Sequence, residues 1–335
     1  MDNLTHTLLG AALSRAGLNQ KMEQASVTLM IAANLPDLDI VTGAWGNLAY
    51  LHYHRGITHS MAGVSVLGLL LAAAIFLLQR RSWRKSPESA PPPSFPAIAL
   101  VCLAGTWSHL LLDFTNSYGV RPFLPFSDRW VAWDIEFIID PIILAVLVCG
   151  LVLPSLFKMI SDEVGARGKA RGRGGAIVAL VLIGALWITR DINHRSAVAK
   201  LSAFTYRGED ATTIFAYPKP ANPFMWNGIV ETEHAYFALD VGMNFSALNL
   251  NQAKVYYKPE DSDVLRAARE TRTAKIFLNF SQIPIYSVMK RGEDTLVTIH
   301  DLRFDSATRR RRAFITRILI SKDLHVLSEQ FNFGG

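Results

Sequence analysis

Two residues near the end of an apolar stretch have types and spacing suited to metal binding. His109 and Asp113 are four residues apart in the segment TWSHLLLD. On a helix this spacing places both side chains on one face, one turn apart. An imidazole and a carboxylate so placed can bind one metal ion. Ionisable side chains at membrane depth are costly and usually face an interior or a cavity. The pair therefore predicts a functional site, although an interhelical hydrogen bond without metal fits it equally well on its own.

The same residue types recur in three motifs earlier in the chain, LTHTLLGAAL, NLPDLD and HYHRGITHS, and again near residue 140. Mixed imidazole and carboxylate ligands suit zinc, manganese or iron. Because the set exceeds the needs of one tetrahedral ion, it predicts two divalent ions, zinc first and manganese as the alternative. The predicted metal ligands are His6, Asp37, Asp39, His54, His59, His109, Asp113 and Asp140. The predicted catalytic residues are Asp39, Arg55 and Asp113.

Each motif also has a plainer interpretation. PDLD is commonly a helix stop followed by a turn. Asp140-Pro141 is typical of a helix start, with Asp as the cap and Pro at the first helical position. Arg55 fits a phosphate of the substrate, but also a lipid headgroup. Asp134 is either an additional ligand or a solvated loop charge. The ordered occurrence of all the motifs favours the metal interpretation.

Composition divides the chain into two parts. It has 335 residues, enough for about two domains, and is 50% hydrophobic with a mean hydropathy of +0.21. The apolar residues concentrate before Arg190. The net charge is +6 and the pI about 9.3, but much of the excess lies in two short loops, so no nucleic-acid partner is expected. Cys102 and Cys149 lie in apolar runs and indicate no disulfide framework. The start of the chain lacks the basic region of a cleavable signal peptide.

Residues 1–195 are expected to form an α-helical membrane bundle of about five apolar helices, the first two short. Pro36 should end or bend the second apolar segment. Clear membrane-helix candidates follow, and the last run is expected to continue as a helix to about Lys200. The apolar segments are 4–18, 25–41, 61–79, 97–114, 137–160 and 176–189, and residues 42–58 are expected to be a polar connection.

Residues 196–335 are expected to form a soluble α+β domain. Residues 262–280 fit one amphipathic helix. Three prolines should exclude regular structure from about 217 to 224, and the basic run 309–312 should be a solvated turn. Strand-like runs of β-branched and aromatic residues occur at 229–241, 295–304, 313–321 and 325–333.

Charge bias orients the chain in a membrane. The loops 80–96 and 161–175 are rich in Lys and Arg, which predicts that both are cytoplasmic. Helix 61–79 then begins outside, helix 97–114 ends outside, and helix 137–160 begins outside. This assignment places all predicted ligands on one face of the membrane and predicts an extracytoplasmic second domain.

Four ordered motifs carry a family resemblance. DNLTHTLLGAAL, NLPDLD, HYHRGITHS and SHLLLD resemble the YdjM-type inner-membrane family, whose metal-dependent hydrolase activity is itself inferred. The resemblance covers about residues 1–145, and NPFMWNGIVETEHAYFAL at 222–239 is similar to the C-terminal part of longer bacterial members. It implies a reaction class but no substrate.

A more distant similarity links the motif order to zinc-dependent phospholipases C and single-strand nucleases. It implies ligands at His6, at one of Asp37 and Asp39, at one of His54 and His59, and at His109 and Asp113. Those enzymes also use an N-terminal Trp, whereas this chain starts Met1-Asp2, and a second His-x-x-x-Glu/Asp pair that is missing here. Two ions are therefore expected rather than three.

The expected function is a membrane-bound, metal-dependent hydrolase of phosphoesters, lipid or lipid-linked, with the lipid bilayer as its surroundings. The alternative is a non-enzymatic membrane protein, or an ion- or proton-coupled transporter, that uses the same His/Asp cluster. A transporter usually has internal repeats and polar groups near the bilayer midplane. The absence of a repeat in the sequence and the position of the polar groups at helix ends favour the hydrolase.

Overall fold

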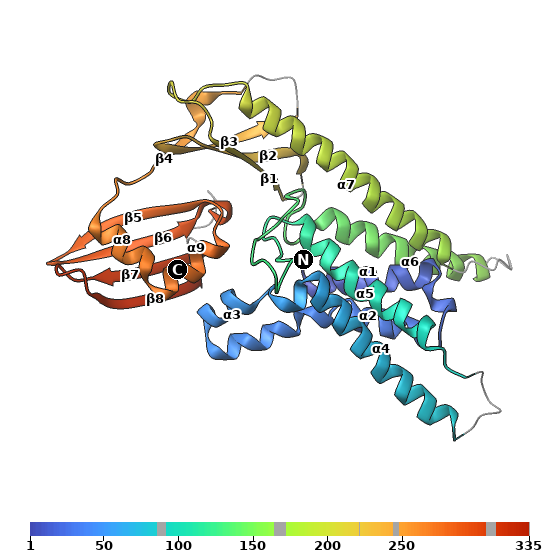
Figure 1. Ribbon diagram of the computed structural model, residues 1–335. Helices are drawn as coiled ribbons and strands as arrows, with labels where there is room; N and C mark the ends of the chain where they lie inside the picture. The colour runs from blue at the N-terminus through green and yellow to red at the C-terminus, as the bar shows by residue number, and fades with distance from the viewer. Residues whose placement is uncertain (86–91, 164–171, 221, 244–247, 306–312, 335) are drawn as a thin grey trace. The chain divides into compact units, whose positions relative to one another are not determined.

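The computed structural model describes residues 1–85, 92–163, 172–220, 222–243, 248–305 and 313–334 (Figure 1). Contacts divide them into two compact units, described separately below. The helical unit comprises Met1–Leu38, Arg55–Ser196 and Pro218–Met225. The α+β unit comprises Asp39–His54, Ala197–Tyr217 and Trp226–Gly335. The predicted basic residues Arg167, Lys169 and Arg171 and the run 309–312 lie outside the described residues.

The helical unit contains the predicted membrane helices. Among its described residues, α4, α5 and α7 are long and apolar enough to cross a membrane, and α6 includes a shorter apolar stretch. The pair α2 and η2 would be a fourth span, bent by 40° beside Pro36 as predicted. The elements are α1 (Asn3–Ala16), α2 (Ala25–Ala32), η2 (Leu35–Trp45), α4 (Met61–Trp83), α5 (Phe95–Thr115), α6 (Pro141–Glu163) and α7 (Arg173–Ser202).

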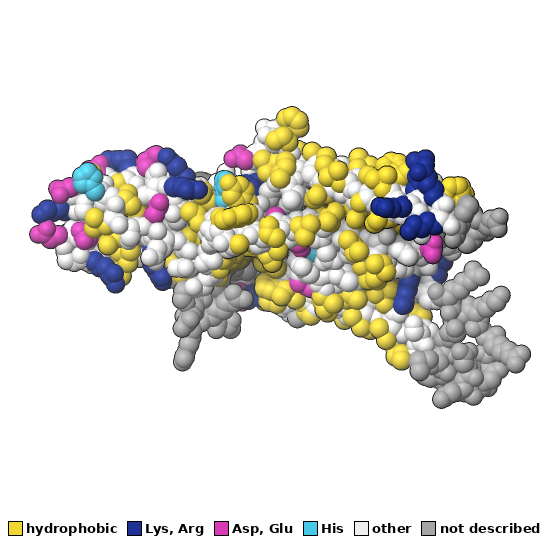
Figure 2. Space-filling model, turned by 90° about the horizontal axis from the view of Figure 1, so that it is seen from below, with side chains coloured by type: hydrophobic (Ala, Val, Ile, Leu, Met, Phe, Trp, Pro, Cys, Tyr) yellow, Lys and Arg dark blue, Asp and Glu magenta, His cyan; other side chains and the backbone are white. Residues whose placement is uncertain are grey.

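α4 and α5 form an antiparallel hairpin. Val64 packs with Leu110 near one end, and Ala72 packs with Ile98 toward the other. The hairpin therefore places the start of α4 beside the end of α5, and the basic connection between them at the opposite end. Figure 2 shows hydrophobic side chains over much of the visible face of the helices, with Lys and Arg gathered at one end. This surface is that expected of helices that face lipid.

Two glycines allow α1, α2 and α5 to approach closely. A Cβ on Gly10 of α1 would lie 2.8 Å from the Leu29 carbonyl oxygen of α2. A Cβ on Gly105 of α5 would lie 2.5 Å from the Ala32 Cβ. Real Cβ atoms do not approach so closely, so α2 can sit here only because both positions are glycine. The end of α2 is thereby held against the last two turns of α5.

The α+β unit contains two four-stranded sheets among its described residues, each with its strands in sequence order. β3–β4 and all pairs of the second sheet are antiparallel. α8 (Asp263–Glu270) and α9 (Arg272–Phe280) contact the second sheet, and α3 (Asn47–Tyr53) packs against α9 and β8. The strands are β1 (Thr213–Lys219), β2 (Asn222–Glu231), β3 (Ala235–Gly242), β4 (Lys254–Tyr257), β5 (Pro284–Arg291), β6 (Asp294–Asp301), β7 (Ala313–Ile320) and β8 (Val326–Gly334).

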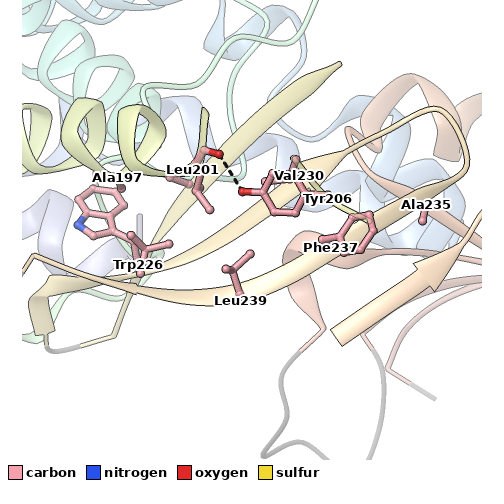
Figure 3. Packing of buried hydrophobic residues seen from close by; sticks show 10 residues of the cluster. Ala197, Leu201, Tyr206, Trp226, Val230, Ala235, Phe237 and Leu239 are labelled. Atoms are coloured by element: carbon pink, nitrogen blue, oxygen red, sulfur yellow. Dashed lines mark hydrogen bonds between the residues drawn. The ribbon is translucent and has the colours of Figure 1, made fainter. Parts of the chain in front are cut away.

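The end of α7 supplies part of the core of the first sheet (Figure 3). Leu201 of α7 and Trp226 of β2 are fully buried in this cluster. The hydroxyl of Tyr206 donates to the Leu201 carbonyl oxygen at 2.8 Å, so the helix end and the following turn are tied together. Burial in this cluster accounts for the extension of α7 past its apolar run, as predicted.

The structure corrects several sequence expectations. Helix 262–280 is two helices, because Thr271 has an extended backbone and its side chain caps α9. Prolines 218 and 223 lie within strands, since Pro218 is on the edge strand β1 and Pro223 is near the start of β2. The connection 42–58 contains the end of η2 and all of α3. Strands β1, β4 and β5 had no sequence prediction, and run 229–241 holds a turn between β2 and β3.

Candidate metal site

Four predicted ligands meet inside the helical unit. His109 and Asp113 lie on the last two turns of α5, and His59 lies in a 3-10 turn (η3, Ile57–His59) just before α4. Asp37 comes from η2, where Pro36 has broken the apolar segment. We call these four residues the His/Asp quartet. The hairpin of α4 and α5 and the close approach of α2 bring them to one point.

Five of the six distances between the ligand atoms of the quartet fit a tetrahedral metal site. His59 Nε2 lies 3.0 Å from His109 Nε2, 3.3 Å from Asp37 Oδ1 and 3.4 Å from Asp113 Oδ2. His109 Nε2 lies 3.5 Å from both of these carboxylate oxygens. Ligand atoms about 2.0–2.1 Å from one tetrahedral ion are separated by about 3.3 Å. The ligand atoms are therefore spaced as if around a single centre.

Neighbouring groups orient both imidazoles. His109 Nδ1 lies 2.7 Å from the Ala33 carbonyl oxygen, which can only accept, so Nδ1 carries the proton. In the neutral ring, Nε2 then presents its lone pair to the quartet. His59 Nδ1 lies 3.0 Å from Thr58 Oγ1. A hydrogen bond from the far ring nitrogen is the usual way in which a metal-binding histidine is held.

The hydrogen bonding of the quartet is incomplete without a cation. Asp113 is 0% exposed, yet its Oδ2 has no hydrogen-bond partner among the described residues. With His109 Nδ1 donating to Ala33, two neutral imidazoles have at most one Nε2 proton to share among His109 Nε2, Asp37 and Asp113, so acceptors outnumber donors at the quartet. A divalent cation would satisfy all four lone pairs at once. The donor set, two imidazoles and two carboxylates, fits zinc or manganese.

The other oxygen of Asp113 faces positive charge. Arg55 Nη2 donates to Asp113 Oδ1 at 2.8 Å, and the Met1 amino group also contacts this oxygen. His6 Nε2 lies 3.5 Å away, and the His6 ring stacks on His109 with centroids 3.8 Å apart. Neither ring nitrogen of His6 has a hydrogen-bond partner among the described residues. Asp113 thus joins the quartet on one side to the Arg55 guanidinium, the Met1 amino group and an uncommitted imidazole on the other.

Comparison with known proteins gives the family. Residues 1–196 match the family described as "YdjM inner membrane protein". The chain belongs to the YdjM inner membrane protein family. The resemblance carried by the four motifs is thereby confirmed. A curated relative, "Uncharacterized protein YfhP" of Bacillus subtilis (strain 168), is 25% identical over 337 residues, covering 98% of this chain and 94% of the relative. No solved structure matches the chain.

In this YdjM-family chain the Arg55 guanidinium donates to several protein acceptors, and its predicted phosphate-binding role stays a prediction. Besides Asp113, its guanidinium donates to Asn116 Oδ1 at 3.1 Å and to the Gly119 carbonyl oxygen at 3.0 Å. It also lies 4.6 Å from the centre of the Tyr118 ring. Its backbone is left-handed, with φ of 52°, a conformation that costs energy in a non-glycine residue. These contacts make Arg55 an anchor for Asp113.

Three further predicted ligands of the YdjM-family chain, Asp39, His54 and Asp140, are not members of the quartet. Asp39 and His54 belong to the α+β unit, where Asp39 Oδ1 and His54 Nδ1 are 2.8 Å apart. Asp140 caps α6, its Oδ1 accepting from the backbone N–H groups of Ile142 and Ile143. Its Oδ2 accepts from Arg190 at 2.6 Å. The capping interpretation of Asp140-Pro141 therefore describes the structure, and Asp140 is outside the quartet.

A buried polar cluster lies beside the end of α5, at Glu136, which the sequence allowed to be a solvated loop charge. Glu136 is 0% exposed; its Oε1 accepts from Trp187 Nε1 at 2.6 Å, and Oε2 lies 2.8 Å from Thr115 Oγ1. Burial raises the pKa of Glu136 to about 7. The Thr115 hydroxyl lies within hydrogen-bond distance of both Glu136 Oε2 and the Leu112 carbonyl oxygen, at 2.8 and 2.7 Å. The sequence feature that could have predicted this cluster is Arg190, a charged residue within an otherwise apolar helix.

Proposed function

We propose that this chain is a membrane-bound, metal-dependent hydrolase that binds a divalent cation in the His/Asp quartet. The observation that carries the proposal is the 3.0–3.5 Å spacing of the ligand atoms, together with the unpartnered Oδ2 of Asp113. Zinc is the first choice, with manganese as the alternative. When bound, the ion supplies a Lewis acid that lowers the pKa of water and polarises a phosphoester.

The quartet itself accounts for one of the two ions expected from sequence. A second ion bridged by Asp113 would have to lie near Oδ1. That oxygen already contacts the Arg55 guanidinium and the Met1 amino group, and a further cation there would be repelled. We therefore assign one ion to the quartet and leave His6 as a neutral imidazole. His6 Nε2 is then available to accept a proton beside the reacting group.

The proposed substrate is a phosphoester, lipid or lipid-linked. Two features support this class. The quartet lies within helices whose exposed surface is apolar, so a substrate that resides in the membrane reaches it without leaving lipid. Asp37, with 13% of its side chain exposed, is the least buried member of the quartet, whereas the other three are 0–1% exposed. Access to the quartet is therefore expected from the Asp37 side.

The first test is the metal content of the detergent-purified full-length protein, after reconstitution with zinc or manganese. We expect about one equivalent in the wild type and in the matched control His325→Ala, an exposed histidine of the α+β unit. His109→Ala and Asp113→Ala should lose it, because each removes one of four ligands. Two equivalents would restore the two-ion expectation. No bound metal in the wild type would refute the hydrolase and favour the transporter alternative.

A further inference from the structure

An open groove of ≈ 470 Å³ lies on the surface of the helical unit beside the quartet. Its walls are the apolar side chains Val27, Met30, Ile31, Leu35 and Leu38, from α2 and η2. Val27, Ile31 and Leu38 are about half exposed, at 54%, 49% and 57%. The groove therefore offers a long apolar surface that the described chain leaves uncovered.

The groove also has two polar residues in its lining, and its η2 residues flank Asp37 in the chain. Thr7 and Asn34 also line it, and Asn34 Nδ2 donates to Thr7 Oγ1 at 2.9 Å. The Asn34 carbonyl oxygen accepts from the Asp37 backbone N–H at 3.2 Å. Asp37 itself lies in η2 between the groove residues Leu35 and Leu38. The groove thus runs beside the one quartet member that is appreciably exposed.

We propose that this groove binds an acyl chain of the lipid substrate and leads its phosphoester to Asp37. The occupant follows from the surroundings. α2 and η2 together qualify as a bent membrane span, so the groove opens into the hydrocarbon of a bilayer, where acyl chains are the available ligands. The apolar walls match such a chain, and the polar side chains of Thr7 and Asn34 match its ester and headgroup. The conclusion that the bound lipid is the substrate rests on the proposed hydrolase function. Binding of an acyl chain in the groove does not depend on that function.

Photo-crosslinking tests the groove without requiring catalysis or metal. The protein would be reconstituted into phosphatidylglycerol–phosphatidylcholine vesicles that contain a phosphatidylglycerol with a diazirine in its acyl chain, and labelled residues mapped by mass spectrometry. We expect label to concentrate on Met30, Ile31 and Leu38. Leu70 and Leu77 of α4, which are 61% and 63% exposed, measure ordinary contact with the bilayer. If α4 and the groove residues are labelled equally, so that labelling depends on exposure alone, the proposal is overturned.

Two variants that fill the groove from opposite ends guard against a local folding defect. Leu38→Trp and Val27→Trp should each reduce groove labelling by about fivefold, because the added ring occupies the volume of the acyl chain. Leu70→Trp on α4 is the matched control and should leave groove labelling unchanged. Unreduced labelling in both groove variants would refute the site.

The metal-dependent hydrolase proposal and the lipid-groove proposal can be refuted independently of each other. Concentrated groove labelling in a protein that binds no metal would support the lipid site and refute the hydrolase. Metal in the quartet with labelling that follows exposure alone would support the hydrolase and refute the groove. If a lipid phosphoester is hydrolysed, the groove variants should raise KM for long-chain relative to short-chain esters, and equal effects on both would contradict acyl-chain binding.

Discussion

At the residue scale, two roles of Arg55 can be told apart by experiment: an anchor for Asp113 and a group that binds substrate. Its guanidinium pairs with a fully buried carboxylate and with two further protein acceptors. Arg55→Ala should destabilise the protein by about 3–5 kcal/mol, because it leaves the buried Asp113 carboxylate without its guanidinium partner. The unfolding midpoint in detergent, without substrate, would measure this loss. The exposed Arg129→Ala is the control. Unchanged stability with a raised KM for a phosphoester would instead return Arg55 to phosphate binding.

Glu136 predicts a pH dependence of stability. Its pKa of about 7 in the folded protein exceeds the ordinary 4.5, so the folded state binds more protons between these values. The contribution of Glu136 to stability should therefore be greatest below about pH 4.5 and fall as pH rises to about 7, by roughly 3 kcal/mol at most. Glu136→Gln, a neutral isostere, should flatten this slope in unfolding measured from pH 4.5 to 8. The exposed Glu293→Gln should keep the wild-type slope. A wild-type slope in Glu136→Gln would show that Glu136 is not the titrating group.

At the element scale, apolar length predicted α4 and α5 well, because a membrane helix is defined locally by composition. Pro36 likewise marked the break that exposes Asp37. The break at Thr271 was not visible, since a threonine within an amphipathic pattern caps a helix only when its backbone becomes extended. The sequence also could not show which of His54 and His59 belongs to the quartet. Residues 39–54 pack into the α+β unit through long-range contacts of α3, and these contacts decide which histidine joins the quartet.

The contact between α2 and α5 gives a prediction at this scale. A Cβ at position 105 would lie 2.5 Å from Ala32 Cβ and 3.2 Å from the Ala33 backbone nitrogen, so α2 must move. Gly105→Ala should cost about 1–3 kcal/mol and weaken metal binding, because the Ala33 carbonyl oxygen leaves His109. Unfolding and metal content would both be measured. Gly184→Ala in α7 meets nothing within 4 Å and should stabilise by about 0.5–1 kcal/mol. Equal behaviour of the two variants would exclude the packing argument.

At the scale of the whole molecule, the hairpin of α4 and α5 separates the basic connection from the quartet by the length of a membrane helix. If the basic loops are cytoplasmic, as the charge bias predicts, the quartet lies toward the outer face. α7 begins beside a basic loop and ends in the α+β unit, so that unit should also be extracytoplasmic. The orientation of the site and that of the second domain are therefore one prediction.

Single cysteines would test this orientation in a background without Cys102 and Cys149. Ser127→Cys, between α5 and α6, and Glu293→Cys, in the α+β unit, are both exposed. In intact spheroplasts, a membrane-impermeant maleimide should label both, whereas Arg84→Cys at the end of α4 should react only after lysis. The reverse pattern would place the quartet on the cytoplasmic side, where a lipid substrate would have to come from the inner leaflet. A third outcome is labelling of Ser127→Cys but not of Glu293→Cys before lysis. It would contradict the argument that α7 carries the chain from the cytoplasmic side to an extracytoplasmic α+β unit. A helix that spans the membrane once cannot have its basic start and the domain that follows it on the same side.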